Sequence, residues 1–238
     1  MVRLPEVSPR APRAATRYSL KRYQIVTTLL PNSRSQQVVT FPIVKVFTLW
    51  LGDLVNGATT LQPVLMGIVL AVLFAVMIVS PVSTVGIATA IFIDGIASGT
   101  ANLGAVAAGF TLLVAGWRVN GFATSILHVL GSPKVQMANM LSKPVTFLPV
   151  ICSAAILGAV GGALGISGTP ISAGFGISGL MGPLAALNYE GWGWSAGNVM
   201  IITFVYVVLP LALALLFCWL FEKVLHLTKS EYFSLDFK

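Results

Sequence analysis

Residues 199–221 have the sequence VMIITFVYVVLPLALALLFCWLF, in which no side chain is charged. A helix of roughly 20 apolar residues is long enough to cross the hydrocarbon core of a bilayer, which is about 30 Å thick. Three basic residues follow this stretch, namely Lys223, Lys229 and Lys238. Because basic loops and ends stay on the cytoplasmic side of a membrane, the sequence predicts a last transmembrane helix with a cytoplasmic C-terminal end.

The composition extends this conclusion to the whole chain. Of 238 residues, 56% are hydrophobic and 9% are charged, whereas about 25% are charged in soluble domains. The net charge of +7 is concentrated in residues 1–34, which carry +6 of it. Residues 1–40 therefore form a basic tail, for which three interpretations stay open: a disordered extension or altered N-terminus, a mitochondrial-type presequence, or an arm that binds lipid headgroups. We expect no nucleic-acid partner.

Other apolar segments predict an all-α, polytopic transmembrane protein with about five crossings. Residues 41–60 are amphipathic and predict a helix at the membrane surface. The other predicted crossings are 64–80, a weaker one at 82–97, then 100–117 and 145–164. In the last of these, Gly158 and Gly162 stand four residues apart, a spacing that lets another helix approach closely.

The charges also predict which segments do not cross. Residues 118–144 contain three basic residues and no acidic one, so this loop is predicted to be cytoplasmic, like residue 223. The chain must then cross the membrane an even number of times between them. Three apolar segments lie in this interval, however, and the weakest of them, the middle one, is rich in glycine. We therefore predict that 166–187 is a re-entrant hairpin, whose non-helical backbone marks a translocation site. The predicted organisation is a tail at 1–40, a membrane domain at 41–222 and a cytoplasmic tail at 223–238.

The hairpin sequence GISGTPISAGFG, residues 165–176, supplies the first candidate substrate contacts. Thr169 and Ser172 flank a proline that lacks an N–H, and the glycines leave backbone carbonyls free. Hydroxyls and carbonyls suit a sugar or another polyol; alternatively, the small residues only permit tight packing. The segment GIASGT at 95–100 is similar and adds Thr100. Paired segments of this kind are typical of transporters built from repeats.

Two polar residues upstream and one loop histidine complete the candidates. Asp94 lies in an apolar stretch, where a carboxylate costs about 2.5–3.5 kcal/mol at the bilayer centre. With Asn102 it can bind substrate hydroxyls or couple transport to a cation; alternatively, it lies at the end of the span in water. His128 can titrate near neutrality or be a solvated loop residue. The predicted substrate-binding residues are Asp94, Thr100, Asn102, His128, Thr169 and Ser172.

Catalytic and metal-binding motifs are absent from the sequence. It contains no Walker loop, GxSxG, HExxH or CxxC pattern. The two cysteines, Cys152 and Cys218, lie in apolar runs, where a thiol behaves as a small apolar side chain. We expect no metal and no cofactor.

Three stretches resemble one family of membrane proteins: LHVLGSPKVQMANML at 127–141, KPVTFLP at 143–149 and GTPISAGFGISG at 168–179. They are similar to the enzyme IIC-type proteins of the bacterial phosphoenolpyruvate-dependent sugar phosphotransferase system, in the branch that includes perfringolysin-regulator-like proteins. The resemblance covers residues 41–222, and because family members have additional spans at the N-terminus, it implies a shortened or altered start. It also implies a sugar substrate, cytosolic phosphotransferase partners, a homodimer and the bacterial inner membrane.

One position departs from the family pattern. Sugar-transporting members carry a glutamate before a proline in a hairpin motif, where it contacts the hydroxyl that becomes phosphorylated. Here Thr169 precedes Pro170, and a threonine is a poor base. Binding and passage of a sugar are therefore the expected activity, while the phosphoryl donor belongs to a partner. Two alternatives stay open: a membrane ligand sensor that regulates gene expression, and an ion-coupled carrier outside this system.

Overall fold

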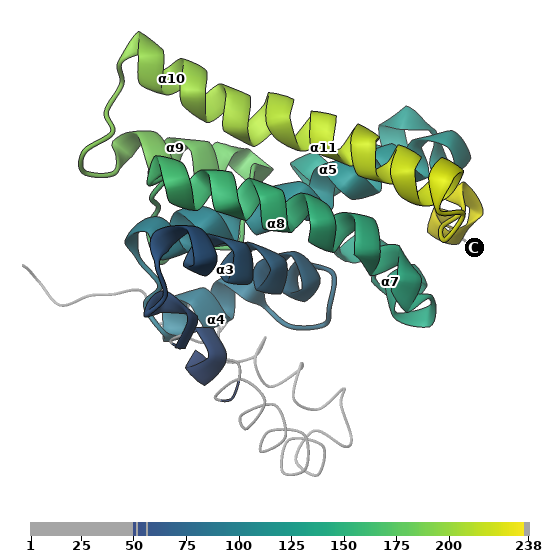
Figure 1. Ribbon diagram of the computed structural model, residues 1–238, viewed down its shortest axis with the longest axis horizontal. Coiled ribbons are helices and arrows are strands. Elements are labelled where there is room, and N and C mark those ends of the chain that lie inside the picture. The colour runs from purple at the N-terminus through teal and green to yellow at the C-terminus, as the bar shows by residue number, and fades with distance from the viewer. Residues whose placement is uncertain (1–49, 51, 56, 236–238) are drawn as a thin grey trace, which may run out of the picture. The chain divides into compact units, whose positions relative to one another are not determined.

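The computed structural model describes residues 50, 52–55 and 57–235, and these are helical or irregular with no β-strand among them (Figure 1). The predicted all-α class is confirmed. The predicted basic tail at 1–40 and the first part of the predicted surface helix, 41–49, lie outside the described residues. The longer helices are α3 (Pro63–Ile78), α5 (Gly95–Ser125), α8 (Phe147–Leu164) and α11 (Leu209–Trp219). The shorter α-helices are α4 (Thr84–Ala90), α6 (Leu127–Leu130), α7 (Met137–Ser142), α9 (Met181–Asn188) and α10 (Ala196–Thr203).

Short turns of other helix types join these elements. The 3₁₀ turns are η1 (Pro133–Gln136), η2 (Pro144–Thr146), η3 (Ser178–Leu180) and η6 (Ser230–Phe233). The π-helical turns η4 (Phe204–Val208) and η5 (Leu220–Val224) continue α10 and α11 into one apolar rod from 196 to 224. Within the described part of the chain, three helical stretches are long and apolar enough to cross a membrane, namely 95–125, 144–164 and 196–224, and α3 is a shorter apolar helix.

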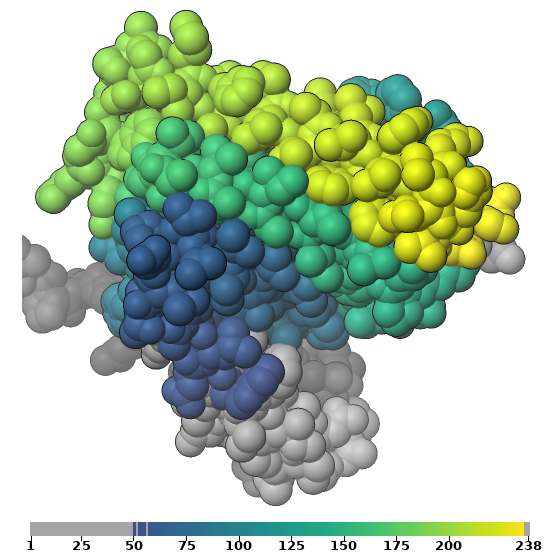
Figure 2. All heavy atoms as spheres, viewed as in Figure 1, coloured from purple at the N-terminus to yellow at the C-terminus, as the bar shows by residue number. Residues whose placement is uncertain are grey.

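Glycines set the packing of α3, α5 and α8. A Cβ atom on Gly67 of α3 would overlap the carbonyl of Gly158 in α8, and one on Gly104 of α5 would overlap the carbonyl of Ala71 in α3. The predicted close approach at Gly158 is therefore confirmed, and Gly162 likewise meets the start of α3. In Figures 1 and 2, α3, α8 and the α10–α11 rod lie side by side on the face in view.

These contacts also fix the helix directions. Gly67 of α3 faces Thr100 of α5, and Ala71 faces Gly104 four residues later, so α3 and α5 run parallel. Residues 79–94 must therefore lead the chain from the end of α3 back to the level at which α3 begins, where α5 starts. The prediction of a helical span at 82–97 is wrong, because this return contains only the seven-residue α4 and a break at Phe92, whose φ is +53°.

Residues 165–188 enter and leave the bundle at the same end. Gly168 exchanges two backbone hydrogen bonds with Gly95 at the start of α5, both 3.0 Å. The chain then runs along α5 as far as Gly176, beside Val106, and α9 brings it back. The hydroxyl of Tyr189, which directly follows α9, donates to Asp94 at 3.1 Å. This path is that of the predicted re-entrant hairpin.

The C-terminal segment packs against the loop at 118–144. The side-chain amides of Asn120 and Gln136 each donate to the carbonyl oxygen of Phe233 at 2.7 Å. Asn139 donates to the carbonyl of Ser234 at 2.7 Å. The basic loop and the C-terminal segment therefore lie at the same end of the bundle.

Candidate functional site

Polar side chains on α5 hold the hairpin in place. The fully buried Asn102 donates from Nδ2 to the hydroxyl of Ser172 at 3.3 Å, and its Oδ1 accepts from the backbone N–H of Gly176 at 3.2 Å. One turn earlier, Ser98 donates to the carbonyl of Thr169 at 2.7 Å. These side chains satisfy backbone groups of a non-helical segment, as a membrane interior requires. We name these contacts of Ser98 and Asn102 the clasp.

The hairpin turns where its backbone adopts positive φ angles. Gly174 has φ +83° and Gly176 has φ +64°, a region that glycine enters without steric cost. Thr84, in the first turn of α4, donates its hydroxyl to the carbonyl of Gly174 at 3.3 Å. The broken return segment and the hairpin therefore meet beside the middle of α5.

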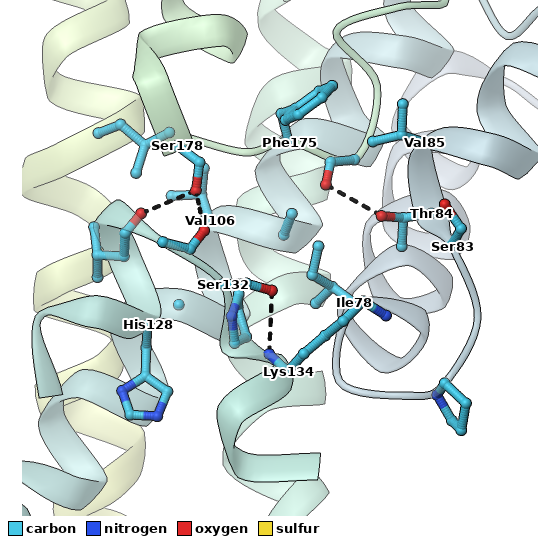
Figure 3. A pocket seen from close by; sticks show the side chains of 18 residues that line it. Ile78, Ser83, Thr84, Val85, Val106, His128, Ser132, Lys134, Phe175 and Ser178 are labelled. Atoms are coloured by element: carbon cyan, nitrogen blue, oxygen red, sulfur yellow. Dashed lines mark hydrogen bonds between the residues drawn. The ribbon is translucent and has the colours of Figure 1, made fainter. Parts of the chain in front are cut away.

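A cavity of about 290 Å³ lies at this meeting point, close to the lower end of small-molecule sites, which span roughly 300–1,000 Å³. Four segments enclose it (Figure 3): the end of α3 with the chain that follows, the middle of α5, the loop after α6, and the hairpin tip. The polar side chains among its lining residues are Ser83, Thr84, His128, Ser132, Lys134 and Ser178, and none of the lining residues is acidic.

Ser178 connects the hairpin tip to the loop after α6. Its hydroxyl lies 2.5 Å from the carbonyl oxygen of Gly131 and 3.4 Å from that of Val129. Hydroxyls, carbonyls and an apolar floor formed by Ile78 and Val106 therefore converge on one volume. Such a lining can hold a small polyol by several hydrogen bonds.

Comparison with known protein families identifies the family of the chain. The family model described as "Phosphotransferase system, EIIC" matches residues 18–235. The chain belongs to this family. Membership and the apolar helices make it a multi-pass membrane protein of sugar transport by the phosphotransferase system. No curated protein and no solved structure matches the chain.

Lys134 places a cation at the edge of the cavity of this EIIC protein. Its ammonium group donates to the carbonyl oxygens of Ser80 and Val82, both at 2.6 Å. Burial lowers the pKa of Lys134 from its ordinary value. These two hydrogen bonds tie the loop to the chain just after α3, so Lys134 fixes the shape of the cavity.

His128 is the one predicted site residue that lines the cavity, and it is buried rather than solvated. Its Nδ1 lies 2.8 Å from the carbonyl oxygen of Ser125 and therefore donates the hydrogen bond. Burial is the larger effect on His128 and lowers its pKa, while this hydrogen bond raises it. Nε2 is a buried acceptor without a partner among the described residues. In Figure 3 the imidazole points away from Thr84 and Ser178.

The other predicted residues lie along the first half of α5 and the descending limb of the hairpin. Asn102, Thr169 and Ser172 come together in and next to the clasp, where the Thr169 hydroxyl accepts from the N–H of Ser172 at 3.3 Å. Thr100 donates its hydroxyl to carbonyls of its own helix at 2.9 and 3.1 Å. Asp94 is exposed and lies at the position that precedes α5.

Sequence reasoning did not identify the polar lining residues Thr84, Lys134 and Ser178. Thr84 and Ser178 are separated by more than ninety positions in the chain, and each looks like an ordinary polar residue in a loop or helix start. One available signal was the proline-lysine pair of the loop, which belongs to the stretch that resembles the family. A second was the glycine-rich tip that precedes Ser178.

Proposed function

We propose that this EIIC protein is the sugar-translocating permease subunit of its system, acting in the bacterial cytoplasmic membrane. The observation that carries the proposal is the cavity at the tip of the re-entrant hairpin, where non-helical backbone and hydroxyls converge at mid-depth of α5. Polar substrates of transporters bind at such breaks, because helix interiors have no free backbone groups to offer.

The sugar would occupy the cavity, and its hydroxyl groups would form hydrogen bonds with Ser178, Thr84 and the nearby backbone carbonyls. In this arrangement Asn102 and Ser172 position the hairpin, and Lys134 holds the loop that closes the cavity. The lining contains no carboxylate that could act as a base toward a sugar hydroxyl. We therefore assign binding and passage to this chain and phosphoryl transfer to its partners.

The cytosolic components would approach the end of the bundle that carries the 118–144 loop and the C-terminal segment. This end is basic, as expected for a cytoplasmic surface. We also propose that the protein works as a homodimer. The exposed apolar side chains Phe204, Val208 and Leu211 of the α10–α11 rod offer a face for a second copy, and disulfide trapping of a Val208→Cys variant across two subunits tests this.

Uptake of labelled hexoses into proteoliposomes tests the function. The proposal predicts accumulation of sugar phosphate only when phosphoenolpyruvate and the general phosphotransferase proteins are present. Uptake driven by a cation gradient without them would favour an ion-coupled carrier. Binding without any uptake would favour a sensor.

Two variants locate the site on the hairpin. Ser178→Ala removes a hydroxyl at the tip, and Thr169→Val removes one at the exposed start while keeping the side-chain shape. Loss of a hydroxyl that contacts the sugar costs about 1–3 kcal/mol, or roughly tenfold to a hundredfold in affinity. The cavity proposal predicts this loss for Ser178→Ala and none for Ser142→Ala, a control serine outside the cavity lining. The same loss in Thr169→Val alone would move the site to the start of the hairpin.

A further inference from the structure

A second groove lies between α5 and α11, outside the lining of the sugar cavity. Its volume is about 390 Å³. One end of the groove is apolar and includes Val114, Leu215 and Leu216. The other end holds charged and polar side chains. The complete lining is Val114, Trp117, Arg118, Leu215, Leu216, Cys218, Trp219, Glu222, Lys223 and Ser230.

The groove crosses the boundary between hydrocarbon and water. On α5 no residue from 95 to 117 is charged, and Arg118 is the first charge. On the last helix no residue from 196 to 221 is charged, and Glu222 is the first. Trp117 is 48% exposed and Trp219 is 57% exposed, and tryptophans gather at the level of the lipid headgroups.

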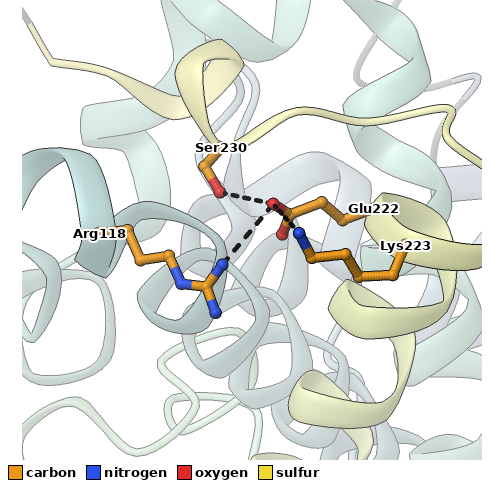
Figure 4. Close-up of polar contacts among 4 residues, drawn as sticks. All are labelled: Arg118, Glu222, Lys223 and Ser230. Carbon is orange, nitrogen blue, oxygen red and sulfur yellow. Dashed lines mark hydrogen bonds and ion pairs between the residues drawn. The ribbon is translucent and has the colours of Figure 1, made fainter.

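The charged end of the groove has a positive balance. Glu222 Oε1 lies 3.8 Å from Nη1 of Arg118 and 4.0 Å from Nζ of Lys223, and it accepts from the hydroxyl of Ser230 at 3.3 Å (Figure 4). Two cations therefore face one anion. The side chain of Arg118 is 61% exposed, so its planar guanidinium can present further N–H donors to a phosphate.

We propose that this groove binds one anionic phospholipid of the leaflet next to the basic loop. The acyl chain lies along Val114, Leu215 and Leu216, and the phosphate is held by Arg118 and Lys223. Basic pockets between transmembrane helices on the cytoplasmic side suit anionic headgroups. Because the apolar wall continues directly from the charged end, a lipid fits the whole groove and inorganic phosphate fits only its rim. This inference stands independently of the sugar site.

Native mass spectrometry of the full chain in mild detergent tests the proposal, with phosphatidylglycerol and phosphatidylcholine of the same acyl chains as probes. The wild type is expected to bind phosphatidylglycerol more tightly. Arg118→Gln and Lys223→Gln should each weaken that binding by roughly fivefold, whereas Glu222→Gln should strengthen it by a similar factor. Lys143→Gln is the charge-matched control, because Lys143 lines neither this groove nor the small pocket beside it.

Lys223→Gln and Glu222→Gln should change the affinity for phosphatidylglycerol in opposite directions. If the two residues only formed a structural ion pair, both variants would change the affinity in the same direction. An exposed ion pair contributes little to stability, so these variants should elute from gel filtration like the wild type. Equal binding of the two lipids, or an equal loss in Lys143→Gln, would show an annular lipid only and overturn the proposal. Displacement of phosphatidylglycerol by millimolar inorganic phosphate would overturn it as well.

Discussion

Replacing Asn102 by leucine tests whether α5 holds the hairpin through the clasp. The substitution keeps a similar volume but removes the bonds from Asn102 to Ser172 and Gly176. Ser172 keeps its hydrogen bonds with Thr169, so the main loss is at Gly176, whose buried N–H would have no acceptor. Such a group costs about 1–3 kcal/mol. The equilibrium between docked and undocked hairpin should therefore shift by roughly fivefold to more than a hundredfold.

Hydrogen exchange measured by mass spectrometry provides the assay. Peptides from 165–180 should exchange faster in Asn102→Leu by that factor, while peptides from α8 should be unchanged, because α8 makes no bond to Asn102. Asn188→Leu is the control, since Asn188 is exposed and bonds only within 184–194. Unchanged exchange at 165–180 in a folded Asn102→Leu protein would refute the clasp. Equal acceleration in α8 would show general destabilisation instead.

Three further predictions concern packing, topology and pH. Gly104→Ala places a Cβ 2.8 Å from Cα of Ala71, so overpacking should lower stability by about 1–3 kcal/mol, seen as a lower melting temperature; Gly197→Ala, with open space around it, should melt like the wild type or higher. Single cysteines at Ser132 and Ser230 should react with an impermeant maleimide from the same side of a vesicle; labelling from opposite sides would contradict the hairpin. Burial lowers the pKa of His128 in the folded protein, so as the pH falls below about 6.5 this histidine takes up a proton in the unfolded chain first. The melting temperature should therefore be constant just above that pH and decline below it. His128→Gln should flatten this decline.

The sequence was sufficient for the elements whose evidence is local. Residues 145–164 and 199–221 are long, uncharged runs, and a run of this kind has few alternatives to a membrane helix. The glycine spacing at 158 and 162 predicted that another helix approaches closely, since both residues lie on one helix face, and the structure shows that this helix is α3. The hairpin at 166–187 was predicted because the basic residues before and after it place both flanking segments on the cytoplasmic side, which requires an even number of crossings between them.

The sequence failed where tertiary contacts decide the structure. Residues 82–97 are apolar enough for a span, but α4 ends at Ala90 and the chain turns at Phe92, so composition alone did not distinguish a broken segment from a helix. Thr100 looked like a ligand because the segment GIASGT at 95–100 is similar to the start of the hairpin. In the fold that hydroxyl donates to its own helix, which is a common arrangement for threonine in apolar helices.

The loop after α6 connects the cavity with the end of the bundle where cytosolic partners are expected. Gly131 accepts the hydrogen bond from the hairpin tip, and three residues later Lys134 bonds the chain that follows α3. Gln136 and Asn139, on the next turns, hold the C-terminal segment. The hydrogen bonds to the hairpin tip, to the chain after α3 and to the C-terminal segment are therefore all made by residues between 131 and 139. This one short stretch of backbone positions a side of the cavity and the C-terminal segment together.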